Sequence, residues 1–206
     1  MKKIQIKSGR ILPKTTVAPK ISNKLKISLI IIISVFAFIL YTQSINHNYT
    51  LDDHPVIDEN SITTKGLSGI PAILKTDYWY GSGHDESRGP VYRPTSLIIF
   101  AAVWEFSPNN PQVYHFINVL LYSFTCLLLF LVLCKLFKKQ NFLFPFICTL
   151  LYAAHPIHTE VVNNIKSLDE ILCFLFGLIS MLMLLRYNSS KSILTFFWGE
   201  LVFFLL

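Results

Sequence analysis

The stretch VYHFINVLLYSFTCLLLFLVLCKL, residues 113–136, decides the fold of this chain. It holds no charged residue before Lys135 and is long enough to cross the hydrocarbon core of a bilayer as one helix. The composition of the whole chain is typical of a membrane protein, because 52% of its residues are hydrophobic and only 15% are charged. A soluble domain of this size would be more polar. Four further apolar runs cover residues 25–41, 142–154, 171–185 and 193–206.

These runs predict an all-α membrane protein, built as a polytopic bundle of transmembrane helices. The run at 142–154 is short for a crossing, so it would need flanking residues or a thinner bilayer. The run at 193–206 is still apolar at its last residue, with no polar stop. We therefore expect residues 25–206 to be the N-terminal part of a longer membrane domain, preceded by a basic tail at 1–24.

Lysine and arginine predict the orientation of the bundle, because loops rich in these residues stay on the cytoplasmic side. Residues 1–26 hold eight of them and no acid, and three more lie at the end of the run at 113–136 and just after it, at Lys135, Lys138 and Lys139. The N-terminus is then cytoplasmic, and segments 42–111 and 155–170 are extracytoplasmic, in a bacterial inner membrane or the endoplasmic reticulum. The tail lacks interleaved aromatic residues, so we expect no nucleic-acid partner.

The long outer segment 42–111 is too rich in Gly, Pro and Asn to be a single helix. Within it, an apolar run at 95–106 has the length of a helix that lies in the membrane interface. All acidic residues of the chain except Glu200 lie in 52–105 and 160–170. Charged groups near hydrocarbon are costly and tend to be functional, so these two outer stretches are the candidate site.

Asp52 and Asp53 come shortly after the first apolar run. Two adjacent carboxylates repel each other when both are ionised, which raises the pKa of one and makes it a usable general base. The alternative is structural, because the sequence Asp-Asp-His-Pro also suits a turn or a helix cap. The dipeptide alone leaves both interpretations open.

A second polar cluster, HPIHTEVVNNIKSLDE, covers residues 155–170. If this segment is helical from Ile157 onward, Glu160, Asn163 and Asn164 share one face of the helix. Capping and snorkelling at helix ends are the structural alternative. His155, His158 and Glu160 also allow a metal site, but their spacing is loose and we expect no metal ligands here.

Four motifs in order carry a family resemblance: Asp52-Asp53, Tyr92-Arg93-Pro94, HFINVLL at 115–121 and HPIHTEVV at 155–162. Together they resemble the transmembrane and tetratricopeptide-repeat O-mannosyltransferase family and its bacterial relatives, over roughly residues 49–185. Such proteins are multi-span glycosyltransferases of the C superfold. The resemblance implies transfer of a sugar, with mannose as a candidate, from a polyprenyl-phosphate carrier in the membrane lipid to an extracytoplasmic protein or glycan acceptor.

The resemblance also implies roles for individual residues. Asp52 would deprotonate the acceptor hydroxyl, and Asp53 would assist it. The departing phosphate gains negative charge, so it requires cationic donors. Arg93 is the first candidate because its guanidinium fork can bind two phosphate oxygens, and the helix after it would guide the lipid tail. The next candidates for the phosphate are His155, His158 and Lys166, and the supporting residues are Tyr92, Glu160, Asn163, Asp169 and Glu170.

One position departs from the pattern of the relatives, which have an arginine shortly before the acid that opens the fourth span. This chain has Leu168 there, and the nearest base is Lys166. The family also implies further spans and a C-terminal helical-repeat domain, so we expect residues 1–206 to be inactive alone and foresee no cofactor besides the lipid-linked donor. A non-catalytic membrane protein, such as half of a transporter or an assembly subunit, is the alternative. A transporter needs polar residues within its spans, and the first four runs contain few.

Overall fold

The computed structural model describes residues 22–83, 91–190 and 199. All regular structure in these residues is helical, which confirms the predicted all-α class. Nearly all of the run at 193–206 and of the basic tail lies outside the described residues. The α-helices are α1 (Asn23–Tyr41), α2 (Ile70–Ile73), α3 (Pro94–Phe106), α4 (Pro111–Leu136), α5 (Leu143–Ala153), α6 (His158–Asn163) and α7 (Leu168–Ser190). The 3-10 helices are η1 (Thr42–Asn46), η2 (Leu51–Val56), η3 (Thr63–Gly69) and η4 (Ile165–Ser167).

Three of the described helices are long and apolar enough to cross a membrane. They are α1 with its η1 extension, α4, and α7 with η4 before it. Each contains one of the predicted runs, at 25–41, 113–136 and 171–185, and extends beyond it into more polar residues. Ser22 starts the first of these helices, because its side chain accepts a hydrogen bond from the backbone N–H of Leu25 at 3.2 Å.

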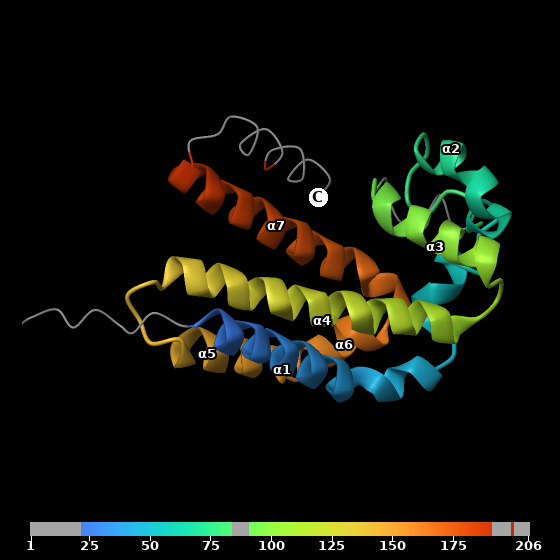
Figure 1. Cartoon of the computed structure of the whole chain (residues 1–206). Coiled ribbons are helices and arrows are strands. Elements are labelled where there is room, and N and C mark those ends of the chain that lie inside the picture. Colours follow the sequence, from blue (N-terminus) through green and yellow to red (C-terminus); the bar gives the residue numbers. More distant parts are fainter. Residues whose placement is uncertain (1–21, 84–90, 191–198, 200–206) are drawn as a thin grey trace, which may run out of the picture.

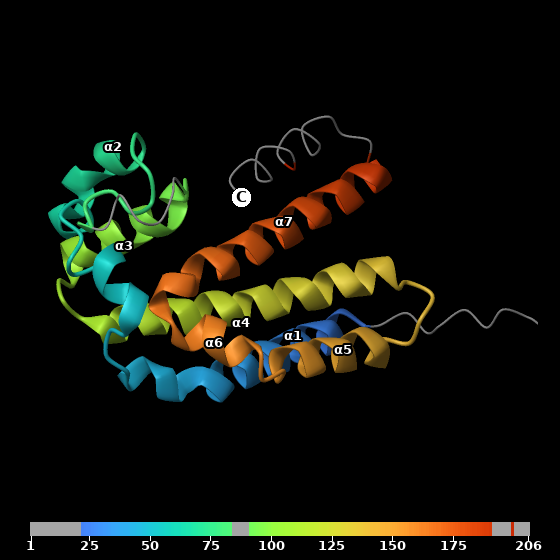
Figure 2. The same cartoon turned by 180° about the vertical axis from the view of Figure 1, so that it is seen from behind.

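Helix α4 is the centre of the bundle, with α1 and α5 on one side of it and α7 on the other (Figures 1 and 2). Lipid tails are as apolar as the helices, so packing rather than water exclusion joins them. The small residue Ala37 on the α1 face is fully buried, and small residues are common where membrane helices pack together. The buried faces follow helical spacing, with Leu29, Ile33, Ala37 and Tyr41 on α1 and Val119, Tyr122, Cys126 and Phe130 on α4.

The apolar run at 142–154 forms only the short helix α5, which has 11 residues. A helix of this length extends about 16 Å, roughly half the thickness of the hydrocarbon core. The chain then turns and continues through α6, which lies nearer the other end of the bundle (Figure 1). The two helices together bring the chain back to the start of α7, so the crossing at 142–154 stays a prediction.

The segment between α1 and α4 folds into a helical cap at one end of the bundle (Figure 1). The predicted interfacial run at 95–106 is helix α3, which begins one residue earlier at Pro94. Asn60 organises the cap, because its buried side chain makes four hydrogen bonds to backbone groups. Its Nδ2 donates to the carbonyls of Pro55 and Tyr80, and its Oδ1 accepts from the N–H groups of Ile62 and Thr63.

The start of α1 and the end of α4 lie together at the opposite end of the bundle from the cap (Figure 1). Lys24 and Lys26 open α1, and Lys135 closes α4. These three lysines, which belong to segments predicted to be cytoplasmic, therefore lie at one end of the bundle, while the cap lies at the other. This arrangement agrees with the predicted topology, although the sidedness itself stays a prediction.

Candidate functional site

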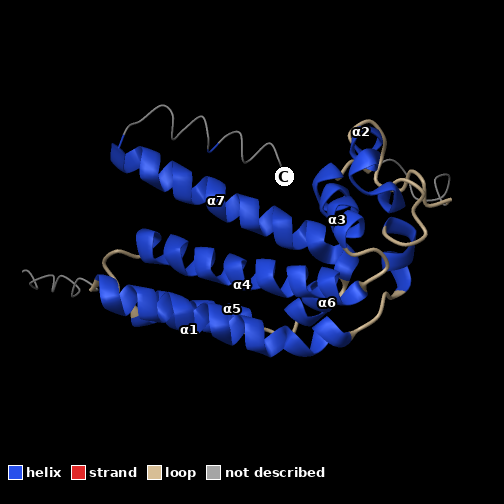
Figure 3. Cartoon of the chain, turned by 45° about the vertical axis from the view of Figure 1, so that its right-hand side comes forward, coloured by secondary structure: helices blue, strands red, loops and turns tan. Residues whose placement is uncertain are grey.

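Among the described residues, a hydrogen bond and an ion pair join the cap to the segment that opens α7. The backbone N–H of Lys166 donates to Oδ1 of Asp53 at 2.8 Å. Nη1 of Arg93 donates to Oδ2 of Asp169 in an ion pair. Figure 3 shows the cap, with α3, beside the first turns of α7. The two polar clusters predicted from the sequence therefore meet at one end of the bundle.

Asp53 is fully buried and accepts hydrogen bonds through both carboxylate oxygens. Besides its bond from Lys166, it accepts from the backbone N–H of Thr50 at 3.0 Å and from the Thr50 hydroxyl at 3.3 Å. Thr50 and Asp53 thus form a capping box at the start of η2. Burial raises the pKa of Asp53, while the hydrogen bonds from Thr50 and Lys166 act against that rise. For Asp53, burial and not repulsion from Asp52 is the main cause of the raised pKa.

Asp52 has different surroundings from its neighbour, since its side chain is only partly buried. The residue before it, Leu51, has a φ of +44° and a side chain that is 90% exposed. A branched residue in this left-handed conformation is strained, and such strain is typical of functional sites. The turn directs Leu51 outward and Asp53 inward. Asp52 is therefore the more exposed of the two carboxylates.

Asn118 contacts the backbone just before Lys166, in addition to the contact that Asp53 makes with Lys166 itself. This residue is fully buried in α4, and its Nδ2 donates to the carbonyl oxygen of Asn164 at 3.0 Å and to that of Ile165 at 3.5 Å. The segment is thereby fixed between the buried amide of α4 and the buried carboxylate of the cap. The position of Lys166 is set by these two contacts.

Replacing Asp53 with Asn tests this connection. A carboxamide has one acceptor oxygen, so either Thr50 or Lys166 must lose its bond and face an N–H₂ donor. We expect Asp53→Asn to lower the free energy of unfolding by about 2 kcal/mol, seen as a lower melting temperature of the purified protein in detergent. The matched control is Asp58→Asn, whose carboxylate contacts the half-exposed His54 ring at 3.0 Å and should cost less than about 1 kcal/mol. Equal melting temperatures for Asp53→Asn and the wild type would contradict the connection.

Arg93 stands at the N-terminus of α3, where its side chain is 47% exposed. The hydrogen bond that Arg93 donates to Asp169 raises the pKa of Arg93, so the guanidinium keeps its charge. Asp169 is fixed in turn, since its Oδ1 accepts the backbone N–H of Glu170 at 2.9 Å. A guanidinium carries five N–H donors. Its contact with Asp169 therefore orients Arg93 without using its full capacity to bind an anion.

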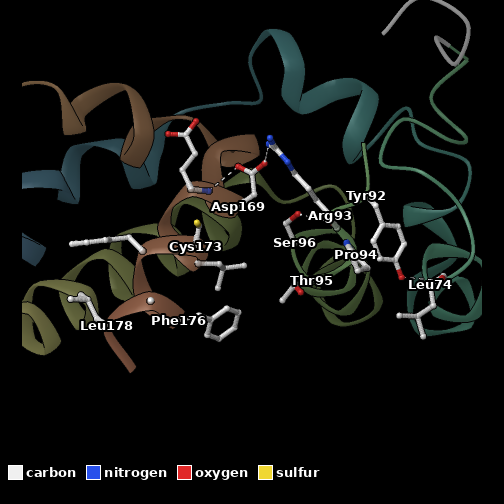
Figure 4. A pocket seen from close by; sticks show the side chains of 14 residues that line it. Leu74, Tyr92, Arg93, Pro94, Thr95, Ser96, Asp169, Cys173, Phe176 and Leu178 are labelled. Atoms are coloured by element: carbon white, nitrogen blue, oxygen red, sulfur yellow. Dashed lines mark hydrogen bonds and ion pairs between the residues drawn. The ribbon is translucent and has the colours of Figure 1, made fainter. Parts of the chain in front are cut away.

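A groove of about 970 Å³ lies between α3 and α7 (Figure 4). Its polar residues gather near the N-termini of the two helices, where Arg93, Ser96, Asp169 and Glu170 contribute to the wall. The rest of the groove follows α7 and is mainly apolar. Tyr92 borders it at the cap side and donates its hydroxyl hydrogen to the Leu74 carbonyl at 3.0 Å. The apolar lining includes Leu74, Pro94, Leu172, Phe174, Phe176 and Leu178.

A second cavity, of about 340 Å³, lies next to Arg93 and is lined mainly by residues of the cap. Tyr78, Trp79 and Val91 supply its apolar walls, and Lys166 and Arg93 supply its cations. Among the residues that the structure describes, Arg93 alone lines both this cavity and the groove. Two of the four residues predicted to bind phosphate, Arg93 and Lys166, are therefore brought together around one cavity.

The two histidines predicted to bind phosphate line neither cavity. His158 packs against Tyr152, with ring centroids 4.3 Å apart, and lies 5.6 Å from the ring of Tyr122. Burial, followed by the charge of His155, lowers the pKa of His158. His158 is thus neutral near pH 7, and His155 is exposed beside it at a ring distance of 6.1 Å. Their predicted role in phosphate binding stays untested.

The face expected for Glu160, Asn163 and Asn164 is only partly formed. Helix α6 ends at Asn163, and Asn164 has an extended backbone with φ −104° and ψ 118°. The carbonyl oxygen of Asn164 accepts a hydrogen bond from the side chain of Asn118. This contact favours the extended backbone at Asn164 over a further turn of α6. Glu160 is exposed and Asn163 is half-buried. Within the described ranges, no group of three His, Cys, Asp or Glu side chains lies close enough to hold a metal ion.

Sequence reasoning missed Asn60, Tyr78, Trp79 and the anchoring role of Asn118. Asn118 lies inside a quoted motif, so a polar amide in an apolar helix was a usable signal. Tyr78 and Trp79 are buried in the cap, at 1% and 8% exposure. Their place in the second cavity depends on contacts between segments that no local pattern shows.

The chain is similar to protein O-mannosyl-transferases. It is 30% identical over 151 residues to human Protein O-mannosyl-transferase TMTC1, which covers 73% of this chain and 17% of that protein. It is 29% identical over 162 residues to TMTC3 of Mus musculus, covering 79% and 17%. It is 30% identical over 161 residues to tmtc2 of Xenopus laevis, covering 77% and 19%. No family model matches the chain, and neither does a solved structure.

The chain spans less than a fifth of the length of these three relatives. The aligned residues make up 73–79% of this chain. Over about three quarters of its length, the chain is therefore an integral membrane homologue of the TMTC protein O-mannosyl-transferases.

Proposed function

We propose that this chain forms the donor site of a membrane glycosyltransferase, which moves mannose from a polyprenyl-phosphate carrier to an acceptor hydroxyl on the extracytoplasmic side. The observation that carries the proposal is the position of Arg93, a charged guanidinium where the apolar α3–α7 groove meets the acidic cap. Such a donor has an apolar tail, an anionic phosphate and a polar sugar. The site has matching parts: the apolar groove would hold the tail, Arg93 would bind the phosphate, and the polar residues of the cap would face the sugar.

The lipid tail would lie in the groove between α3 and α7. Its lining of Leu, Phe and Pro side chains suits an isoprenoid chain, which makes only apolar contacts. The volume of about 970 Å³ holds part of a long tail, while the remainder would extend into the bilayer. Both α7 and the bundle that it joins are apolar enough to sit in lipid, so the tail would not have to leave the membrane.

The phosphate would lie at Arg93. Helix α3 starts at this point with Pro94, and its first N–H groups, on Thr95 and Ser96, add the positive end of a helix dipole. A guanidinium binds phosphate oxygens through paired N–H groups. These donors would stabilise the charge that develops on the phosphate as the sugar leaves, which is where electrostatic catalysis contributes most.

Asp52 would act as the general base. Its carboxylate accepts the proton of the acceptor hydroxyl while the acceptor oxygen attacks C1 of the sugar. The bond from C1 to the phosphate oxygen breaks, and its electron pair leaves with the polyprenyl phosphate. Asp53, fully buried and engaged by Thr50 and Lys166, would not exchange this proton. It would instead fix the positions of Asp52 and Lys166 relative to each other.

A transfer assay with the full-length protein tests this function. The protein is reconstituted in vesicles with radiolabelled polyprenyl-phosphate mannose, and label that becomes attached to protein or glycan is counted. We expect transfer that depends on the protein and occurs on the face opposite the lysine-rich end. A non-catalytic membrane protein would transfer no label, and that result would overturn the proposal.

A further inference from the structure

The groove between α3 and α7 has a charged end and a covered end. Arg93 and Asp169 form their ion pair at the charged end, which is where the proposed function places the phosphate. At the other end, the Ser180 hydroxyl donates to the carbonyl oxygen of Gly199 at 3.0 Å. Gly199 therefore covers α7 at Ser180, just after Leu178, the last described residue of this helix that lines the groove.

Gly199 packs closely on α7. A Cβ atom built at Gly199 would lie 3.3 Å from the Cβ atom of Met183, so backbone rather than a side chain contacts the helix here. Ser180 is buried beneath this contact, at 5% exposure. A lipid tail that follows α7 from Arg93 would therefore have to leave the groove before Ser180 and continue in the bilayer.

Between these two ends, α7 presents an accessible row of residues to the groove. Asp169, Cys173 and Gly177 are spaced four residues apart, so they lie one above the other along the helix, and all three line the groove (Figure 4). The side chain of Cys173 is exposed. A Cβ atom added at Gly177 would meet no neighbouring side chain or segment within 4 Å. This row is therefore open to a ligand and not covered by protein.

We propose that the groove recognises about the first three isoprene units of the carrier and is indifferent to the length of the tail beyond them. The inference rests on the proposed function and deepens it, because it states which part of the lipid contacts the protein. A helix rises about 1.5 Å per residue, so Asp169 to Ser180 extends over about 16 Å. One isoprene unit adds four carbons to the main chain, or about 5 Å with C–C bonds of about 1.5 Å. Three extended units match the length of the groove.

The row gives each part of the tail a neighbour on α7. At about 1.5 Å per residue, Cys173 lies about 6 Å beyond the level of Asp169, and Gly177 lies about 12 Å beyond it. With the phosphate at Arg93, the second unit would pass Cys173 and the third unit would pass Gly177. The small residues at both places leave room for the methyl branch that each unit carries.

Bulk added at either position tests this alignment. The test uses the full-length protein in nanodiscs and prenyl phosphates of one, two, three and eleven units. Each affinity is obtained by displacement of a fluorescent polyprenyl phosphate, whose own affinity is measured for each variant. Gly177→Leu is expected to weaken binding of three and eleven units about tenfold, and of one and two units less than about twofold. Cys173→Leu is expected to weaken binding of two, three and eleven units about tenfold, and to spare one unit.

The comparison of variant with wild type for one ligand cancels the partition of that ligand into the bilayer. Leucine is a better helix former than glycine, so Gly177→Leu should not weaken α7 itself. The matched control is Leu184→Phe, which adds bulk to an exposed residue of α7 beyond Ser180 that lines neither cavity. We expect it to bind all four ligands as the wild type does.

The order of the losses decides the outcome. Losses that begin at the second unit for Cys173→Leu and at the third for Gly177→Leu, with equal losses for three and eleven units, support the inference. Any other pattern, such as losses of one size at every length or no loss, overturns it while the donor site at Arg93 stands. Failure of the wild-type protein to bind any of the four prenyl phosphates overturns the proposed function itself.

Discussion

Asp52→Asn is expected to reduce sugar transfer by about a hundredfold to ten-thousandfold, because an amide cannot take the proton of the acceptor hydroxyl. The substitution removes a charge from a partly buried side chain but leaves the capping box of Asp53 in place. Binding of the lipid-linked donor and the melting temperature should therefore stay close to the wild-type values. Transfer of radiolabelled mannose under saturating donor is the measurement.

The control for this variant is Asp58→Asn, which removes a carboxylate from the same cap but from a position paired with His54. We expect nearly normal transfer from it. Transfer by Asp52→Asn at the rate of the Asp58→Asn control would remove Asp52 from the role of base. A large loss of rate together with a lower melting temperature would instead indicate that Asp52 supports the fold.

Arg93→Ala is expected to weaken binding of polyprenyl phosphate by about tenfold to a hundredfold, since one charge-assisted contact to phosphate contributes about 1.5 to 3 kcal/mol. The same contact stabilises the leaving group, so the rate of transfer should fall by more than the affinity does. Binding measured by displacement of a fluorescent polyprenyl phosphate separates the two effects from each other.

Arg93→Ala also leaves Asp169 without its ion-pair partner, and Asp169 is only 9% exposed. The variant Asp169→Asn provides the control, because it breaks the same ion pair but keeps the guanidinium. If Arg93 binds the phosphate, Asp169→Asn will retain most of the affinity that Arg93→Ala loses. Equal losses of affinity in the two variants would show that the ion pair acts only on the fold.

The long helices could be predicted from sequence because apolar runs of bilayer length have few alternatives to a helix. The starts of α1 and α3, at Asn23 and Pro94, lie within two residues of the starts of the predicted runs at 25–41 and 95–106. The fate of 142–154 was harder to predict. A run that is too short to cross does not show where the chain will turn, and that choice depends on how α6 packs against the rest of the bundle.

The composition of the site could be predicted, but its internal contacts could not. Asp53 and Lys166 are 113 positions apart, and no local pattern predicts that the backbone N–H of one meets the carboxylate of the other. Adjacent aspartates also look equivalent in a sequence. Only the turn at Leu51 separates them into a buried anchor and an accessible carboxylate. The second cavity needs Tyr78 and Val91 to meet Lys166, so it exists only in the folded cap.

The most direct measurement is an experimental structure of the full-length protein with polyprenyl-phosphate mannose bound. It should place the tail between α3 and α7, the phosphate within hydrogen-bonding distance of Arg93, and C1 of the mannose on the side of Asp52. A phosphate bound at the lysine-rich end of the bundle, or anywhere out of reach of Arg93, would contradict the account.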